Sequence, residues 1–323
     1  MERSRLHRLG KPILGNNCER LPILVHYDES GELVNVHFVH RLSHRRGRRQ
    51  HGQMDVHHLA DPHACVRYSK APRQGRTASR MELRGAVIGG TGVVSVVPLD
   101  ETSPVLIPTE FGLVRARLLR RQRVLFVARH GLDHRQPPHK VSYRALAVAM
   151  RQLGVRAVFS TGAVGSLRAD LPPGLLVVCS DLLDLSGRNL TMFEHDVVHT
   201  DMSAPFDPSL RRALLSAARQ EHIEVVDSGV YVCSNGPRYE TPAEIALFRR
   251  AGGDVVGMTV GSEAVAMREA GVPYACIAGV TNLATGLSDS PLEHEEVSQA
   301  MAPLSERMLR IILAAIHEVC GDA

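Results

Sequence analysis

Two short motifs combine glycines with residues that bind anions. GGTG (89–92) follows the apolar run GAVI, and its glycines let backbone N–H groups approach an anion while the Thr91 hydroxyl adds a donor. ARHGLDH (128–134) contains Arg129, whose guanidinium can bind two phosphate oxygens at once. His130 follows it and can donate a further hydrogen bond. Together the two motifs predict a phosphate site.

Other nucleotide-binding and metal-binding sites fit these residues less well. Ser95 stands where a dinucleotide-binding loop needs a third glycine, and no GK[ST] follows as in a Walker loop. His130 and His134 are four residues apart, as are His195 and His199, but neither pair has the glutamate of an HExxH zinc motif. We therefore expect neither a nicotinamide cofactor nor a metal ion.

A second group of residues suits a purine and its sugar. Tyr239 supplies a ring that can stack, and Glu240 supplies a carboxylate that can accept the N1–H of hypoxanthine or guanine. Met258 offers an apolar surface to a sugar, and Thr259 offers a hydroxyl to phosphate. Asn282 carries both a donor and an acceptor, which can read O6 and N7. The alternatives are structural: Glu240 at a helix N-terminus, Met258 in the core and Asn282 in a turn.

Two further segments place such residues beside expected secondary structure. STGAVGSLR (160–168) ends an apolar run in a glycine-rich turn, whose free amides can face phosphate or a purine. A plain tight turn is the alternative. His294 stands at the start of the last helical segment, where the alternative is a surface histidine.

Short apolar runs alternate with helical segments after Met81. The expected strands are 85–88, 123–130, 156–165, 174–185, 229–236, 254–259 and 274–282. The expected helices are 143–154, 208–222, 241–252, 262–271 and 295–319. Thr241 and Pro242 have the residue types of a helix cap and first position. This alternation predicts an α/β fold with a mainly parallel sheet, which binds ligands at the carboxyl ends of its strands, where the motifs lie.

The composition indicates a globular cytoplasmic protein. The 323 residues are 44% hydrophobic, which is enough for a substantial core, and no run of eighteen apolar residues could span a membrane. The basic N-terminus lacks the apolar stretch and the cleavage site of a secretory signal. The six cysteines have no paired spacing, and three lie in apolar strand-like runs, which favours reduced, buried thiols.

The chain divides into two parts of opposite charge at Met81. Residues 1–80 carry 15 Lys and Arg against 7 Asp and Glu, a net charge of +8, whereas residues 81–323 carry 23 against 27, a net charge of −4. The first part also contains nine of the seventeen histidines. The second part opens with MELRGAVIGGTG, which is typical of a first strand and phosphate loop. We therefore assign the catalytic domain to residues 81–323.

The basic part has three possible explanations. A nucleic-acid-binding arm is one. We favour a disordered extension, or upstream sequence translated from an early start codon, and expect no nucleic-acid partner. Within this part, residues 23–40 alternate like a small hairpin around Asp28–Gly31.

Four blocks of the chain resemble one enzyme family: IGGTG, ARHGLDHRQPPHKVSYRA, GPRYETPAE and GDVVGMTVGSEAVAMREAGVPYACIAGVTN. Residues from about 84 to 320 are similar to the trimeric purine nucleoside phosphorylases and methylthioadenosine phosphorylases. The resemblance implies a single α/β domain with a central mixed sheet flanked by helices, the nucleoside phosphorylase fold. It also implies a homotrimer without a cofactor, since inorganic phosphate is a co-substrate. Residues 1–80 have no counterpart in the family.

The resemblance also implies a role for each site residue. Phosphate ligands fall on Thr91, Arg129, His130 and Thr259, with backbone contacts from Gly162 and Ala163. Nucleoside-binding positions fall on Ala163, Tyr239, Glu240, Met258, Asn282 and His294. His199 is similar to a residue that members lend to a neighbouring subunit's site. Among these, Asn282, His130 and Glu240 are the expected catalytic residues.

Three positions distinguish substrates within this family. Methylthioadenosine phosphorylases carry serine at the position of Glu240 and aspartate at that of Asn282, and the aspartate binds a 6-amino purine. Their third position is apolar, whereas this chain has His294, as do enzymes that bind a 5′-hydroxyl. The resemblance therefore implies cleavage of inosine and guanosine in purine salvage. Methylthioinosine phosphorylases, which share Glu and Asn but are apolar at the third position, and methylthioadenosine phosphorylases are the alternatives.

Overall fold

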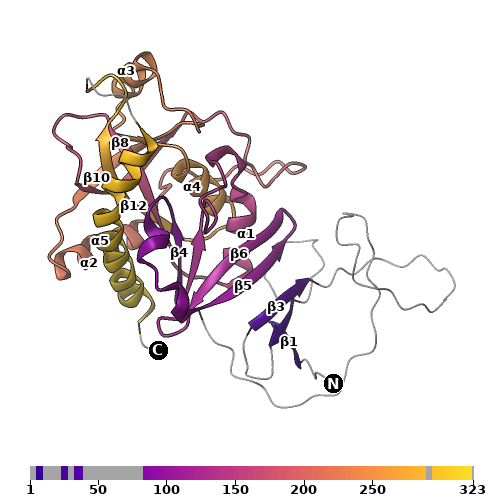
Figure 1. Cartoon of the computed structure of the whole chain (residues 1–323). Helices are drawn as coiled ribbons and strands as arrows, with labels where there is room; N and C mark the ends of the chain where they lie inside the picture. Colours follow the sequence, from indigo (N-terminus) through magenta and orange to yellow (C-terminus); the bar gives the residue numbers. More distant parts are fainter. Residues whose placement is uncertain (1–4, 10–22, 28–32, 39–82, 289–292, 322–323) are drawn as a thin grey trace.

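The computed structural model describes residues 5–9, 23–27, 33–38, 83–288 and 293–321. In this part of the chain, a large sheet lies at the centre and helices cover its faces (Figure 1). Its strands are β4 (Gly85–Gly89), β5 (Thr102–Thr109), β6 (Gly112–Leu119), β7 (Val124–Ala128), β8 (Val158–Ser166), β9 (Leu176–Asp184), β10 (Val226–Cys233), β11 (Val255–Gly257) and β12 (Tyr274–Leu283). The helices are α1 (Tyr143–Leu153), α2 (Pro208–Gln220), α3 (Pro242–Arg250), α4 (Val260–Glu269) and α5 (His294–Cys320). Short 3₁₀ helices are η1 (Val93–Val96), η2 (Leu99–Glu101) and η3 (Pro138–Lys140).

The large sheet is mixed and partly closed on itself. Its strand order is β11-β10-β9-β12-β8-β4-β7-β6-β5, and β11 also pairs with β8, so that five strands form a ring. Neighbours are parallel from β4 to β7 and β8, from β8 to β12, and from β10 to β9 and β11. The β5–β6, β6–β7, β9–β12 and β8–β11 pairs are antiparallel. The sheet thus matches the mixed arrangement that the family resemblance implied.

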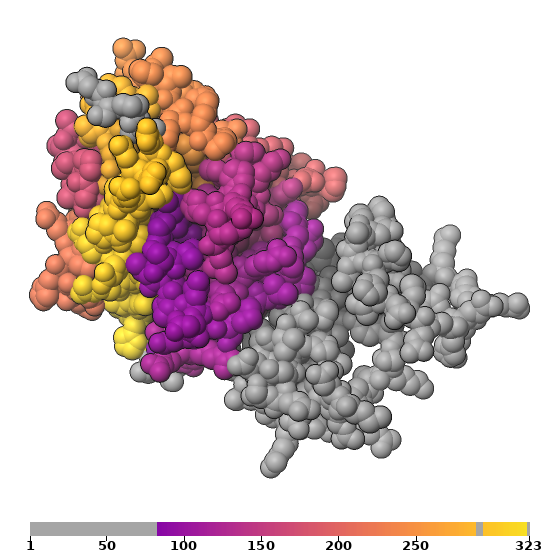
Figure 2. Space-filling model, in the orientation of Figure 1, coloured from indigo at the N-terminus to yellow at the C-terminus, as the bar shows by residue number. Residues whose placement is uncertain are grey.

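The central strands β4, β7, β8 and β12 are buried on both faces because their alternate residues enter two hydrophobic layers. In β12, Ala275 and Ile277 pack in the layer that contains α2 and α5. Cys276 and Ala278, on the opposite face, pack in the layer that contains α1 and α4. The space-filling view shows the yellow C-terminal segment packed against the indigo segment that contains β4 (Figure 2). The two ends of the described domain therefore stabilise each other.

Every strand and helix expected from the sequence forms, with ends shifted by a few residues. The β5–β6 hairpin was not expected, because Pro104 and Pro108 interrupt its first strand and proline cannot donate to a sheet ladder. Its position explains why the prolines are tolerated: β5 is the last strand in the hydrogen-bonded order of the sheet, so one of its edges pairs with no strand of that sheet.

Part of the N-terminal region forms a separate three-stranded sheet. Its strands are β1 (Arg5–Leu9), β2 (Ile23–Tyr27) and β3 (Leu33–Phe38). The antiparallel pairing of β2 with β3 matches the expected hairpin, whose turn lies outside the described residues. Most of residues 1–80 also lie outside them, so the interpretation of this region as an extension or an early start stays a prediction. In the described chain, none of the helices is long and apolar enough to cross a membrane.

Candidate active site

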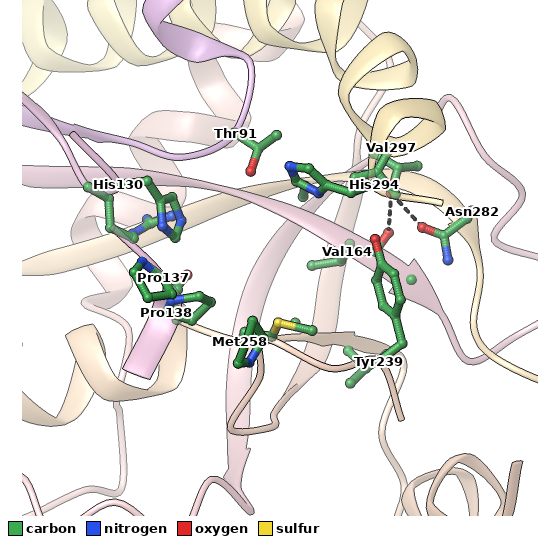
Figure 3. A pocket seen from close by; sticks show the side chains of 18 of the residues that line it. Thr91, His130, Pro137, Pro138, Val164, Tyr239, Met258, Asn282, His294 and Val297 are labelled. Atoms are coloured by element: carbon green, nitrogen blue, oxygen red, sulfur yellow. Dashed lines mark hydrogen bonds between the residues drawn. The ribbon is translucent and has the colours of Figure 1, made fainter. Parts of the chain in front are cut away.

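A cavity of about 320 Å³ opens where six strands end. The residues that line it follow or close β4, β7, β8, β10, β11 and β12. In Figure 3, Tyr239 and Asn282 lie on one side of the pocket and His130 on the other, with Met258 between them. The pocket brings together ten of the twelve site residues expected from the sequence: Thr91, Arg129, His130, Ala163, Tyr239, Glu240, Met258, Thr259, Asn282 and His294.

The GGTG loop can approach Arg129 because Gly90 has no side chain. A Cβ atom on Gly90 would lie 2.7 Å from Arg129 Nη1. Gly92 has a φ of +81°, a left-handed conformation that favours glycine, and a Cβ there would lie 2.9 Å from the Cβ of Met301 on α5. The loop is thus held between α5 and Arg129, with Thr91 in the pocket wall.

Arg129 is buried and paired with Glu263 of α4. Its Nε and Nη2 both donate to the Glu263 carboxylate, and Nη2 also donates to the Thr161 carbonyl at 2.9 Å. Tyr274 donates to the same carboxylate at 2.7 Å. Burial alone would lower the pKa of Arg129, but Glu263 holds it above its ordinary value. Only Nη1 makes no hydrogen bond to the described residues, so it is the nitrogen available to an anion.

His130 is held as a neutral imidazole. Its Nδ1 lies 2.8 Å from the Gln136 carbonyl oxygen, which can only accept, so Nδ1 carries the proton. Burial, and then the charge of Arg129, lower the pKa of His130 to about 4. Nε2 therefore presents a lone pair at neutral pH. The sequence suggested that His130 donates to phosphate, whereas this arrangement makes it an acceptor for a P–OH group.

Three histidine rings form a row along one wall of the pocket. The ring centroids of His130 and His134 are 4.9 Å apart, and those of His134 and His294 are 5.5 Å apart. His134 was not among the expected ligands, and its backbone has a φ of +54°, in the left-handed region. Burial, and then His294, lower the pKa of His134. Within the described residues, no group of His, Cys, Asp or Glu side chains is arranged to hold a metal ion.

Glu240 is separated from the cap of the helix that follows it. The Thr241 side chain accepts from Glu244 N, and the Glu244 side chain accepts from Thr241 N, which forms a capping box for α3. This confirms the cap expected from the sequence. Glu240 instead accepts a hydrogen bond from the Ser234 hydroxyl and is only 7% exposed. Its position in the pocket wall leaves carboxylate lone pairs for a ligand.

Asn282 is already engaged by its neighbours along β12. Its Oδ1 accepts from the Thr281 hydroxyl at 2.7 Å, and its Nδ2 donates to the Leu283 carbonyl at 2.8 Å. The Thr281 hydroxyl also lies 3.2 Å from the Val164 carbonyl oxygen. These contacts orient the amide, and each amide atom retains capacity for a second hydrogen bond to a ligand.

Met258 and Thr259 line the pocket directly after β11. Met258 packs against Gly236, whose φ of +67° and missing side chain leave room for the thioether. Thr259 is 6% exposed and precedes the first turn of α4, where Glu263 pairs with Arg129. The β11–α4 junction thus joins Met258 to the end of the pocket that contains Arg129.

Two expected residues lie outside the pocket wall. Gly162 is one position deeper in β8, where the wall is formed by Ala163, Val164 and Gly165. His199 is exposed in the segment between β9 and α2, away from this pocket. Neither residue lines the pocket of the single chain, so the backbone contact expected of Gly162 and the role of His199 in a neighbour's site stay predictions.

Comparisons with known proteins agree with this geometry. Residues 86–317 match the model of the phosphorylase superfamily. A 6-oxopurine nucleoside phosphorylase from Pyrococcus furiosus is 39% identical over 72% of this chain and 92% of its own length. A probable S-methyl-5′-thioinosine phosphorylase from Methanopyrus kandleri is 40% identical over 72% and 91%. A methylthioadenosine phosphorylase structure from Schistosoma mansoni, in complex with adenine, aligns with a TM-score of 0.68 and 27% identity over 75% of this chain and 93% of that one.

The extent of these matches is sufficient to place the chain. They cover the described α/β domain from β4 to α5, which contains all the residues of the pocket. The chain therefore belongs to the phosphorylase superfamily.

Proposed function

We propose that this chain is a purine nucleoside phosphorylase that cleaves 6-oxopurine nucleosides with inorganic phosphate. The products are the free base and α-ribose 1-phosphate. The observation that carries the proposal is that one pocket has two chemically different ends. Anion-binding groups from Thr91, Arg129 and His130 line one end, and Tyr239 and Glu240 line the other.

At the anion-binding end, the chain holds and orients phosphate. Arg129 Nη1 donates to one oxygen, while the Glu263 partner keeps the guanidinium fixed. Neutral His130 accepts a hydrogen bond from the P–OH of a monoprotonated phosphate through Nε2, so the deprotonated oxygens are free to face the sugar. Thr91 and Thr259 add hydroxyl donors. The phosphate charge then stabilises the ribosyl oxocarbenium ion that forms as the glycosidic bond breaks.

At the other end, the chain stabilises the departing purine. Glu240 accepts the N1–H of hypoxanthine or guanine, and Tyr239 stacks on the ring. Asn282 forms hydrogen bonds with N7 and O6 as negative charge develops on the base. Losing one such preorganised contact costs about 3 kcal/mol, on the order of a hundredfold in rate. A single displacement, with phosphate and purine on opposite faces of the sugar, inverts the anomeric carbon.

The 5′ end of the sugar decides between related substrates. His294, stacked on His134, gives this end polar ring edges that suit a 5′-hydroxyl. We therefore favour inosine and guanosine. S-methyl-5′-thioinosine is the alternative, since it has the same base, which Glu240 and Asn282 would bind in the same way. The 6-oxopurine nucleoside phosphorylase and the probable S-methyl-5′-thioinosine phosphorylase are also about equally similar to this chain.

The working enzyme is a homotrimer in the cytoplasm, with phosphate and nucleoside as its small-molecule partners and no cofactor. His199 lies outside the pocket of its own chain, which suits a residue lent to a neighbour. Val197 and Val198 beside it are 89% and 48% exposed, an apolar surface that a subunit contact would cover.

Strict dependence on phosphate tests the reaction class. Inosine incubated with the protein should yield hypoxanthine and ribose 1-phosphate only when inorganic phosphate is present. A nucleoside hydrolase would use water instead and release free ribose. Hypoxanthine release at an undiminished rate in phosphate-free buffer would show that the chain is a hydrolase.

A comparison of specificity constants tests the substrate. Inosine should exceed adenosine and methylthioadenosine by up to about ten-thousandfold, because unmatched buried polar groups discriminate strongly. Inosine should exceed methylthioinosine by only about ten- to a hundredfold, since a small apolar substituent shifts binding by about 1–3 kcal/mol. A preference for methylthioinosine would overturn the role of His294 alone, and a preference for methylthioadenosine would overturn the roles of Glu240 and Asn282.

A further inference from the structure

Arg188 lies in the loop after β9 and contacts the backbone that carries Met258. Its Nη1 donates to the Met258 carbonyl and to the Ser262 hydroxyl, each at 2.9 Å. Arg188 itself does not line the pocket. Its guanidinium therefore contacts the β11–α4 junction without forming part of the pocket wall.

The same guanidinium holds the segment that carries the purine-facing residues. Arg188 Nε donates to Asn235 Oδ1 at 2.9 Å, and Nη2 donates to the Asn235 carbonyl. Asn235 is followed at once by Gly236 and Pro237, and this segment leads to Glu240. The Nε–Nη2 edge of the Arg188 guanidinium is thus bound to one residue, Asn235, at the start of the purine-facing loop.

A third connection reaches the loop that carries His130. Arg188 Nη1 lies 3.2 Å from the Tyr143 hydroxyl, and its guanidinium lies 5.4 Å from the centre of that ring. The Tyr143 hydroxyl donates its own proton to the Pro138 carbonyl at 2.8 Å. Pro138 lines the pocket in the same loop as His130. Arg188 therefore connects three pocket loops through one rigid group.

These partners are all neutral. Within the described residues, Arg188 forms no ion pair, so its hydrogen bonds go to two carbonyls, an amide and two hydroxyls. The planar fork spreads its N–H groups over two sides: Nε and Nη2 bind Asn235, and Nη1 shares its two hydrogens among Met258, Ser262 and Tyr143. The ammonium of a lysine is a single point with three donors and cannot span this set. The arrangement depends on the shape of the group as well as on its charge.

We propose that Arg188 is a positioning residue that sets the distance between the sugar-facing Met258, the purine loop and the phosphate loop. The proposal rests on the proposed function, because it assigns these loops to one reaction. Misplacing reacting groups by about 1 Å costs on the order of a hundredfold in rate. Loss of the Arg188 fork should therefore reduce catalysis although the residue touches neither phosphate nor nucleoside.

Arg211 provides a matched control. It lies on α2, and its Nε and Nη2 donate to the Cys179 and Asp227 carbonyls at 2.8 and 2.7 Å. Like Arg188 it ties backbone segments together, but neither it nor its partners line the pocket. Arg211→Ala should therefore lower stability without a specific effect on catalysis.

The experiment compares Arg188→Ala, Arg188→Lys and Arg211→Ala in the full chain. Thermal unfolding, kcat, and KM for inosine and for phosphate are measured for each protein. We expect Arg188→Ala to lose about a hundredfold in kcat/KM, with a raised KM for inosine. Arg211→Ala should have an unfolding temperature similar to that of Arg188→Ala, but its kcat/KM should stay within about twofold of that of the unaltered chain. Arg188→Lys should recover less than about a tenth of the lost activity, because it restores charge without the fork.

Added guanidinium and phosphate binding complete the test. Guanidinium at tens of millimolar should raise the activity of Arg188→Ala but not that of Arg211→Ala. Calorimetry with inorganic phosphate should show weaker binding to Arg188→Ala than to the unaltered chain or Arg211→Ala. Kinetics of Arg188→Ala within about threefold of the unaltered chain, or an equal loss in Arg211→Ala, would overturn the proposal.

The two proposals fail in different ways. If the unaltered chain cleaves no purine nucleoside in the presence of phosphate, the proposed function is wrong. Phosphate calorimetry on the three variants then still decides the role of Arg188, since it requires no turnover. Equal phosphate affinity in all of them would overturn that role as well.

Discussion

At the scale of single residues, the pocket is organised by which atoms can donate and which can only accept. His130 gives its one N–H to Gln136 and turns a lone pair to the pocket. Arg129 gives two hydrogen bonds to Glu263 and one to the Thr161 carbonyl, and keeps Nη1 for an anion. Glu240 can only accept. A ligand is therefore selected by the matching of its own donors and acceptors.

Changing Asn282 to aspartate tests this matching at the purine end. The variant loses the N–H that Nδ2 gives to the Leu283 carbonyl and places a negative charge beside it. Inosine cleavage should fall by about a hundredfold or more, while activity on adenosine rises relative to inosine. Specificity constants for both nucleosides measure the change. Asn189→Asp, the same change at an exposed position, should leave both unaltered.

The depressed pKa of His130 makes stability depend on pH. Burial, and then Arg129, lower its pKa to about 4 in the folded chain, whereas the unfolded chain takes up the proton near pH 6.5. Between these values the unfolded state binds more protons, so the free energy of unfolding falls as pH is lowered from about 6.5 to 4, by up to about 3 kcal/mol. Denaturant unfolding at a series of pH values measures this slope.

A glutamine at position 130 cannot titrate, so His130→Gln should show a shallower slope than the unaltered chain over the same pH range. His195→Gln, at an exposed position, should keep the original slope. Identical slopes in all three proteins would contradict the assignment of a buried, neutral His130.

At the scale of elements, strand ends place the site and helix caps fix the loops that carry it. Six strands deliver pocket residues from their carboxyl ends. The capping box of α3 holds the backbone directly after Glu240. Glu263, in the first turn of α4, fixes Arg129 across the pocket floor. Local helix starts thus act as anchors for catalytic groups.

The α3 cap should matter for substrate binding as well as for stability. Glu244→Ala removes the acceptor for Thr241 N and should lower the free energy of unfolding by about 1 kcal/mol. It should also raise KM for inosine, because the backbone directly after Tyr239 and Glu240 is then no longer held by the hydrogen bond from Thr241 N to Glu244. Asp207→Ala, which removes the N-cap of α2, is the matched control: it should cost similar stability without changing KM. Unchanged KM in both variants would limit the α3 cap to a structural role.

At the scale of the whole molecule, the family match and the pocket lie in the same domain. Residues 86–317 match the phosphorylase superfamily, and the pocket residues lie between Thr91 and Val297. Removing residues 1–80 changes the net charge from +4 to −4 but removes no residue of the pocket.

A chain that begins at Met81 should therefore fold, assemble and turn over like the full chain. Its kcat/KM for inosine should stay within about twofold, and light scattering should give the same number of subunits, because the core and pocket are retained. Both proteins are compared at equal subunit concentration. Loss of solubility or of activity in the shorter chain would show that residues 1–80 belong to the enzyme.

Sequence alone predicted most of the elements and ten of the residues that line the pocket. Alternating apolar runs and helical periods depend on near neighbours, so the strands and helices from β7 to α5 follow from local pattern. Motifs such as ARHGLDH and GPRYETPAE identify the chemistry because residue type limits what a side chain can donate or accept. The β5–β6 hairpin was not predicted. Its prolines argue against a strand unless that strand lies at the edge of a sheet, and only the structure shows that β5 does.

Only the tertiary structure decided how these residues are connected. The Glu263 partner of Arg129 is 134 positions away in the chain, and Arg188 reaches Asn235, Tyr143 and Met258 across separations of 47, 45 and 70 residues. No local pattern records such pairs. The neutral, accepting state of His130 also depends on burial and on the nearby Arg129 charge, which the sequence does not display. The sequence thus determined which chemical groups are available, and long-range packing determined their protonation and their positions.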